Sequence, residues 1–139
     1  MISIDEALEG STPLAKKVRD RGPYPSPADL VAAMRTLAPT LTEQEKIATL
    51  NAHPRIGEDP RRLSPNSLAE QGTDSVPELE RLNAEYERRF GFRFVVFVNR
   101  RPKHEIAQVL RQRLERPREE ELDAGLQAVI DIAEDRLRR

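Results

Sequence analysis

The sequence contains no cysteine and no tryptophan, and aromatic residues make up only 4% of it. Without cysteine the chain forms no disulfide and offers no thiolate for nucleophilic or metal chemistry. The longest apolar run, residues 94–98, is far shorter than the roughly 20 residues that a membrane-spanning helix needs. Stability must therefore come from an ordinary packed core, and we expect no membrane as a partner.

Neither sign of charge is in excess. The chain has 23 Lys and Arg against 24 Asp and Glu, and no basic arm or acidic tail breaks this balance. Nucleic acid is therefore a disfavoured partner. The first residues include Asp5 and Glu6 and lack the apolar centre of a signal peptide. We expect a cytoplasmic protein.

Metal and nucleotide cofactors lack the residue patterns that would hold them. The two histidines, His53 and His104, are far apart, and neither belongs to a His-x-x-x-His or Glu-x-x-His pair. The six glycines are dispersed along the chain and form no phosphate-binding loop. We therefore expect no metal and no cofactor.

The hydrophobic pattern predicts one domain over residues 1–139, an all-α bundle of about five to seven helices. Residues 92–99 are rich in aromatic and β-branched side chains, but no second strand candidate could pair with them, so we expect an extended segment between helices. Two short helices are predicted at 4–8 and 14–19. The longer segments with helical spacing are 26–37, 42–53, 64–71, 75–90, 102–116 and 119–137.

Helix starts are marked by residues that cap free backbone N–H groups. Ser64-Pro65 combines an N-cap with a proline in the first turn. Thr42 with Glu45, and Ser75 with Glu78, have the spacing of a capping box, in which each residue bonds the other's backbone. Gly72 is expected to end the helix that begins after Ser64.

Two short stretches carry the candidate chemistry. His53 precedes Pro54, and a residue before proline is disfavoured in the α conformation, so His53 is expected at a helix exit. Ser67, Glu70 and Gln71 stand at i, i+3 and i+4 and share one helix face. Acid–base catalysis requires the imidazole and the carboxylate to meet. Taken separately, these residues have a simpler interpretation: His53 ends a helix, and Ser67, Glu70 and Gln71 form a solvated helix face.

Arg136 is a third candidate. It follows Val129 by seven residues and Ala133 by three, which places it at the border of the apolar face of the last helix. A guanidinium beside a core face usually meets an anion, either a carboxylate of the protein or a ligand.

Three motifs then occur in a fixed order: His53-Pro54-Arg55-Ile56-Gly57, the segment 67–72, and Leu82-Asn83-Ala84-Glu85-Tyr86 leading to residues 89–95. Together they resemble the 2-oxo-4-hydroxy-4-carboxy-5-ureidoimidazoline (OHCU) decarboxylases of urate degradation, over roughly residues 27–139. Residues 1–26 lack the family's phenylalanine- and tryptophan-containing opening. Asn99-Arg100-Arg101 stands where the family more usually has a small or glycine-containing turn.

The resemblance implies a cofactor-free, all-helical enzyme that releases carbon dioxide from OHCU and forms (S)-allantoin. It implies that His53 is the acid–base residue and that Glu70 is hydrogen-bonded toward the imidazole and the substrate. A homodimer formed through a helix face is compatible with it. The residues implied to line the substrate site are Pro54, Ser67, Leu68, Ala69, Glu70, Gln71, Val96, Phe97, Val98, Asn99, Arg100 and Arg136.

Two other functions stay open at this point. The same site could act on another small ureido or carboxylate substrate. Alternatively, the chain could be a helical interaction module without catalysis, in which Arg136 pairs with an acid and His53 ends a helix. Convergence of His53, Glu70 and Arg136 in one polar pocket would favour an enzyme, and their dispersal would favour the module.

Overall fold

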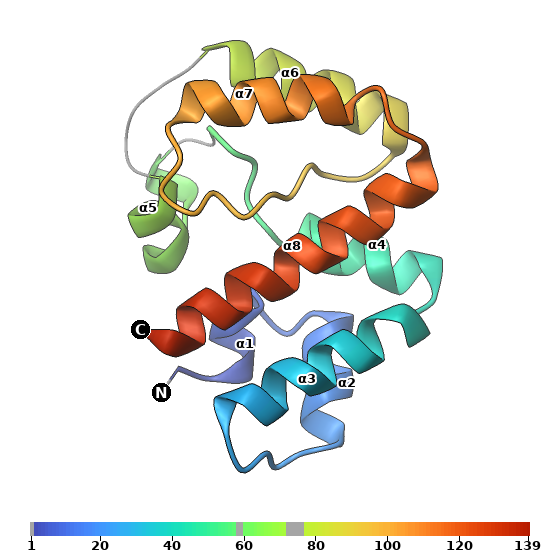
Figure 1. Ribbon diagram of the computed structural model, residues 1–139, viewed down its shortest axis with the longest axis vertical. Helices are drawn as coiled ribbons and strands as arrows, with labels where there is room; N and C mark the ends of the chain where they lie inside the picture. The colour runs from blue at the N-terminus through green and yellow to red at the C-terminus, as the bar shows by residue number, and fades with distance from the viewer. Residues whose placement is uncertain (1, 58–59, 72–76) are drawn as a thin grey trace.

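The computed structural model describes residues 2–57, 60–71 and 77–139, and within them the chain is helical with no strand (Figure 1). The α-helices are α1 (Ile4–Ala7), α2 (Pro13–Asp20), α3 (Pro27–Leu37), α4 (Glu43–Asn51), α5 (Pro65–Gln71), α6 (Pro77–Phe90), α7 (Lys103–Arg113) and α8 (Arg118–Arg138). Two 3₁₀ turns, η1 (Ala38–Thr40) and η2 (Pro60–Arg62), complete the described elements. The all-α class is confirmed, with slightly more helices than the range expected. No helix in these described ranges is long and apolar enough to cross a bilayer.

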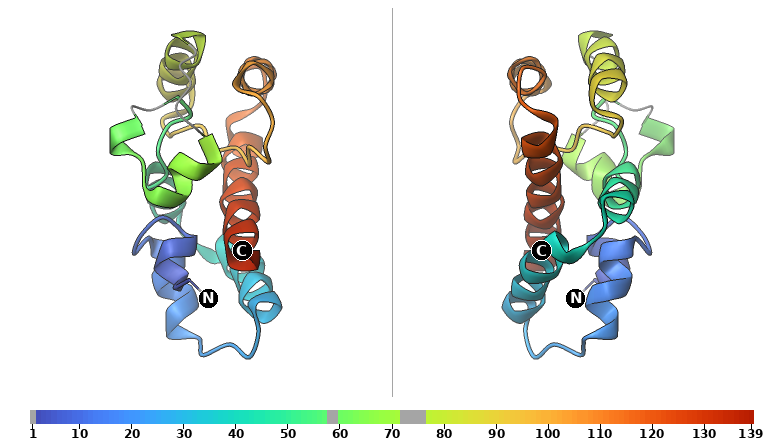
Figure 2. Two further views of the ribbon diagram at one scale, coloured as in Figure 1. Left: turned by 90° about the vertical axis from the view of Figure 1, so that its left-hand side faces the viewer. Right: turned by 90° about the vertical axis from the view of Figure 1, so that its right-hand side faces the viewer.

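The helices form two layers (Figure 2). One layer contains α3, α7 and α8, and the other contains α1, α2, α4, α5 and α6. The 21-residue helix α8 runs along the middle of the molecule and packs on α1, α3 and α4. Gly125 permits the close approach of α4, because a Cβ at this position would lie only 2.9 Å from a methyl carbon of Leu50. The long helix α8 therefore connects the lower helices to the upper pair, α6 and α7.

Local capping explains where several helices begin. The Thr42–Glu45 capping box is present, with N–H···O distances of 3.1 Å and 2.8 Å. Ser64 caps α5 by accepting the Ser67 backbone N–H at 3.1 Å. The predicted Ser75–Glu78 box and the helix stop at Gly72 involve residues 72–76, which lie outside the described ranges.

The segment between α6 and α7 is extended, as the sequence predicted. Residues 93–98 have no regular secondary structure and pass between α7 and α8 (Figure 1). Phe94, Val95 and Val96 are buried. On the side of α7, the Arg113 guanidinium donates to the Val95 carbonyl at 3.1 Å, which satisfies a backbone acceptor that no neighbouring strand reaches. The segment thus forms a fixed wall without being part of a sheet.

Candidate active site

A cavity of about 300 Å³ lies where α5, the carboxyl-terminal turns of α8, the loop after α4 and the extended segment meet. Its walls include His53 from the loop, Glu70 from α5 and Arg136 from α8. These three residues, far apart in the sequence, thus line one polar pocket. This convergence favours an enzyme over an interaction module.

His53 reaches this cavity because α4 ends just before it. The helix stops at Asn51, and Pro54 prevents its continuation. The imidazole is only 3% exposed, and its Nδ1 lies 3.4 Å from the Thr49 carbonyl oxygen. Because a carbonyl can only accept, this contact needs the hydrogen on Nδ1. Nε2, which has no protein partner in the described residues, then presents a lone pair.

The surroundings of His53 favour the neutral ring. Burial, with a smaller contribution from the nearby Arg136 cation, lowers the pKa of His53 to about 4, although the Glu9 carboxylate opposes the shift. Since this value is well below the ordinary 6.5, the imidazole is uncharged at neutral pH. The imidazole is therefore a base at neutral pH, and it becomes an acid only after it takes up a proton.

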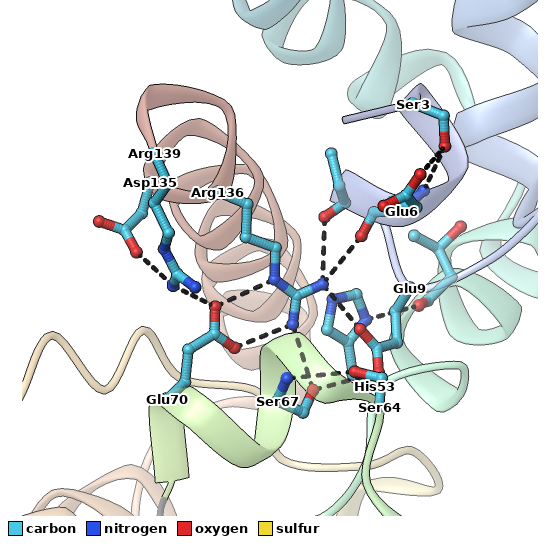
Figure 3. Close-up of polar contacts among 12 residues, drawn as sticks. Ser3, Glu6, Glu9, His53, Ser64, Ser67, Glu70, Asp135, Arg136 and Arg139 are labelled. Carbon is cyan, nitrogen blue, oxygen red and sulfur yellow. Dashed lines mark hydrogen bonds and ion pairs between the residues drawn. The ribbon is translucent and has the colours of Figure 1, made fainter. Parts of the chain in front are cut away.

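Arg136 is the centre of a buried ionic cluster (Figure 3). Its side chain is 1% exposed. Nε and Nη2 form two parallel bonds to the Glu70 carboxylate at 3.0 Å and 2.9 Å, and Nη1 donates to Glu9 at 2.7 Å. Further bonds run to Ser67 Oγ at 3.1 Å and to the backbone carbonyls of residues 6 and 7. A guanidinium has five N–H donors, and these hydrogen bonds together engage all five.

Glu9 belongs to this ionic cluster, although no sequence pattern indicated it. It follows α1 with a φ of 63°, in the left-handed region, and accepts a 3.1 Å bond from Ser67 Oγ as well as the Arg136 contact. Burial alone would raise the pKa of Glu9, but Arg136 and a hydrogen bond from Ser64 together outweigh it and hold this pKa below its usual value. Residues 9 and 136 are 127 positions apart, so no local pattern could have linked them.

Eleven of the twelve residues implied to line the substrate site do line the cavity, and Leu68 does not. One expectation was wrong in its detail. Glu70 was expected to bond toward the imidazole, but its carboxylate is taken by Arg136 and, at 2.7 Å, by Arg139. Two guanidinium groups attract a carboxylate more strongly than a neutral ring does. Gln71 also has a local role, because its Oε1 accepts the Gly57 backbone N–H at 3.0 Å.

The loop that carries His53 is tied to the rest of the fold through its backbone. The Arg93 guanidinium donates to the His53 carbonyl at 3.1 Å and to the Asn51 carbonyl at 2.9 Å. Buried Asn83 on α6 donates to the Ile56 carbonyl at 2.7 Å. The imidazole is therefore presented from a loop held on both sides, as a fixed reacting group requires.

The chain is similar to known proteins over almost its whole length. The family model for OHCU decarboxylase matches residues 2–138, so the likeness includes α1 and α2 and is not confined to the 27–139 range suggested by the motifs. The 2-oxo-4-hydroxy-4-carboxy-5-ureidoimidazoline decarboxylase of Haloferax volcanii is 31% identical, over 95% of this chain and 83% of its own. The corresponding decarboxylase of Halalkalicoccus jeotgali is 28% identical, over 97% of this chain and 81% of its own.

Solved structures share the fold. A crystal structure of OHCU decarboxylase in the presence of (S)-allantoin aligns with a TM-score of 0.75 at 24% identity, over 91% of this chain and 89% of that one. A crystal structure of (S)-allantoin synthase aligns with a TM-score of 0.70 at 25% identity, over 96% of this chain and 46% of that one.

Proposed function

This chain belongs to the OHCU decarboxylase family, whose members are carboxy-lyases of urate degradation, and we propose that His53 transfers the proton that completes its reaction in the cavity described above. The observation that carries the proposal is the buried imidazole itself. It is neutral, it borders the cavity, and its Nε2 has no protein partner in the described residues. Such a group can accept a proton and return it.

The substrate needs no metal or cofactor to lose its carboxylate. OHCU carries the carboxylate on ring carbon C4, which also bears a hydroxyl and adjoins a ring imine at C5. When the C4–carboxylate bond breaks, carbon dioxide leaves and the electron pair forms a C4=C5 double bond while the imine nitrogen gains the charge. This is the same electron flow as in a β-keto acid. The protein must then control where protons go.

Two protons complete the product. Nε2 of His53 accepts the proton of the C4 hydroxyl as that carbon becomes a carbonyl, and the resulting imidazolium delivers it to C5. Water supplies the proton that the ring nitrogen takes up, which balances the equation. Delivery by one imidazole fixed in one wall occurs on one face of C5, and this predicts a single enantiomer, (S)-allantoin. The developing negative charge of the substrate favours the transient imidazolium.

Arg136 is proposed to organise the site without binding the substrate directly, because its donors are already occupied. It holds Glu70 in one orientation at the cavity wall, where the carboxylate can accept hydrogen bonds from the N–H groups of the ureido arm. Backbone groups of residues 96–99 would contact the ring from the opposite wall. Orientation of the substrate and preorganised electrostatics would then supply most of the rate enhancement.

The test generates OHCU in situ from urate with urate oxidase and hydroxyisourate hydrolase and follows circular dichroism. Spontaneously formed allantoin is racemic and gives no signal. We expect the protein to produce a rapid signal of one hand, and His53→Asn to lower the rate at least about a hundredfold. His104→Asn, which changes the exposed histidine of α7, is the matched control and should match the wild type. No effect of the wild-type protein on rate or handedness would overturn the proposal.

Two further predictions concern assembly and location. A homodimer formed through a helix face is expected, and analytical ultracentrifugation of the purified chain would detect it. A cytoplasmic location is expected, and cell fractionation would test it. The proton-transfer proposal depends on neither, because every residue that it uses comes from one chain.

A further inference from the structure

The turn at the end of the extended segment has an unusual backbone. Asn99 and Arg100 have φ angles of 49° and 64°, both in the left-handed region that side chains other than glycine rarely adopt. The Arg101 N–H donates to the Val98 carbonyl at 3.0 Å and closes the turn. Two central residues with positive φ are the pattern of a type I′ turn, which favours glycine. An arginine held there points to a role for its side chain.

The two arginines of this turn differ in what their side chains bind. Arg101 donates from Nε to the Val98 carbonyl at 3.1 Å and from Nη2 to the Phe97 carbonyl at 2.5 Å, so its guanidinium stabilises the turn itself. Arg100 also lines the cavity, but within the described residues its guanidinium has no hydrogen bond and no ion pair. It is exposed, and its donors are available to a ligand.

Arg100 also differs from the other arginines of the cavity wall, because no described acidic side chain is bonded to it. Among the residues that the structure describes, three arginines line the cavity, Arg100, Arg136 and Arg139, against two acids, Glu70 and Asp135. Arg136 is bonded to Glu70, and Arg139 is bonded at 2.7 Å to Glu70 and at 2.8 Å to Asp135. Two positive charges are thus balanced within the wall. The remaining positive charge is that of Arg100.

We propose that the Arg100 side chain recognises the carboxylate of the incoming substrate at the mouth of the cavity and so determines selectivity for anionic over neutral five-membered ureides. This inference rests on the decarboxylase function proposed above. It goes beyond a backbone role for residues 96–100, because the guanidinium is the group that acts. An exposed cation suits this task because the substrate carboxylate loses its charge in the reaction. A fully buried cation would bind that carboxylate so tightly that its loss as carbon dioxide would be slowed. Arg100 thus increases the affinity for the substrate, and the deeper residues carry out the chemical step.

The experiment compares the wild type with Arg100→Gln, Arg100→Lys and Arg100→Gly in the coupled assay. For Arg100→Gln we expect KM to rise roughly tenfold, equivalent to about 1.4 kcal/mol, with kcat kept. Arg100→Lys should retain most of the affinity. Arg100→Gly removes the charge and suits the positive φ, so it should repeat the KM effect in a chain at least as stable. Arg88→Gln, an exposed arginine on α6, is the control for net charge.

Two readouts separate this role from a structural one. The kcat/KM of the wild type should fall as ionic strength rises, and that dependence should weaken in Arg100→Gln. Competitive inhibition by neutral (S)-allantoin should be the same in both proteins. An unchanged KM in Arg100→Gln and Arg100→Gly, or an equal loss of allantoin binding, would overturn the proposal.

A binding measurement distinguishes failure of this inference from failure of the proposed function. Hydantoin-5-acetate is a stable five-membered ring that carries a carboxylate, and calorimetry can measure its affinity without turnover. Weaker binding to Arg100→Gln than to the wild type would support the role of Arg100 even in a protein that proved inactive on OHCU. Equal binding to the two proteins would contradict that role whatever the activity.

Discussion

The two ends of α8 each hold a buried arginine–glutamate pair, but they differ in what lies beside the pair. Near the amino end, Glu121 is 0% exposed and bonds Arg113 at 2.7 Å and the Tyr86 hydroxyl at 2.6 Å. The rings of Phe90, Phe92 and Phe94 pack around that tyrosine. Near the carboxyl end, the Arg136 pair borders the 300 Å³ cavity.

This difference separates a structural ion pair from one that serves a site. Burial and the hydrogen bond to Glu121 raise the pKa of Tyr86, so this hydroxyl stays protonated and donates. The Arg113 guanidinium lies 4.7 Å from the Phe94 ring centre and bonds the Val95 carbonyl, so this cluster holds the extended segment from behind. A buried charge is therefore not by itself a sign of catalysis.

The largest expected effect is on the structural cluster. Glu121→Gln leaves Arg113 buried without its anion and should lower the free energy of unfolding by about 3 kcal/mol. The kcat/KM of the folded protein should change only a few-fold. Urea unfolding measures the first quantity and the coupled assay the second. Glu120→Gln, which alters a neighbouring carboxylate that is 59% exposed, should be nearly neutral. Full stability of Glu121→Gln would remove the contrast between the two ends of α8.

The pH dependence of the free energy of unfolding should reveal the buried His53 at the cavity, beside the carboxyl end of α8. Between the ordinary pKa of 6.5 and the lowered value of about 4, the unfolded chain binds a proton on His53 that the folded chain does not. Stability should therefore fall as pH drops through this window, by about 3 kcal/mol in total. His53→Asn should flatten this part of the profile, and Glu121→Gln should keep it. An unchanged profile in His53→Asn would show that the imidazole is not buried neutral.

Removing the second anion of Arg136 should have a smaller effect. Glu9→Gln leaves the paired bonds to Glu70 in place, so we expect kcat/KM to fall roughly tenfold, about 1.4 kcal/mol. The matched control is Glu6→Gln on α1, the helix that Glu9 follows, because the Glu6 side chain is exposed and bonds Ser3 rather than Arg136. Equal activity of Glu9→Gln and Glu6→Gln would remove Glu9 from the site.

The smallest effect is expected at a half-exposed pair. Arg55 and Glu87 are joined at 2.6 Å and 2.9 Å, but their side chains are 40% and 26% exposed. Arg55→Gln should lower the free energy of unfolding by less than about 1 kcal/mol, because water screens the pair. The wild-type kcat should be kept. A change in kcat would mean that this pair positions the neighbouring His53 loop.

Most of the fold could be predicted from the sequence because its determinants are local. The Thr42–Glu45 box, the proline after His53 and the apolar spacing act within a few residues, and the structure has helices where they indicated. The extended segment was also predicted locally, from aromatic and β-branched residues that lacked a strand to pair with.

The candidate site was predictable only in part. His53 and the α5 residues form motifs, but Glu9 joins the cluster through a contact across almost the whole chain and a backbone in the left-handed region. The orientation of Glu70 depends on competition between Arg136, Arg139 and the imidazole, which spacing alone does not decide. Leu68 was included because its neighbours on α5 belong to the motif, yet its position on the helix keeps it out of the cavity wall.

The most direct test of the account is kcat/KM for allantoin formation by Glu70→Gln, measured beside the free energy of unfolding of the same variant. Because Arg136 keeps Glu9 and the Glu70 side chain is already 18% exposed, stability should fall by no more than about 1 kcal/mol. The wall of the cavity loses its oriented carboxylate, so kcat/KM should fall about a hundredfold. Wild-type activity together with a stability loss as large as that of Glu121→Gln would contradict the account.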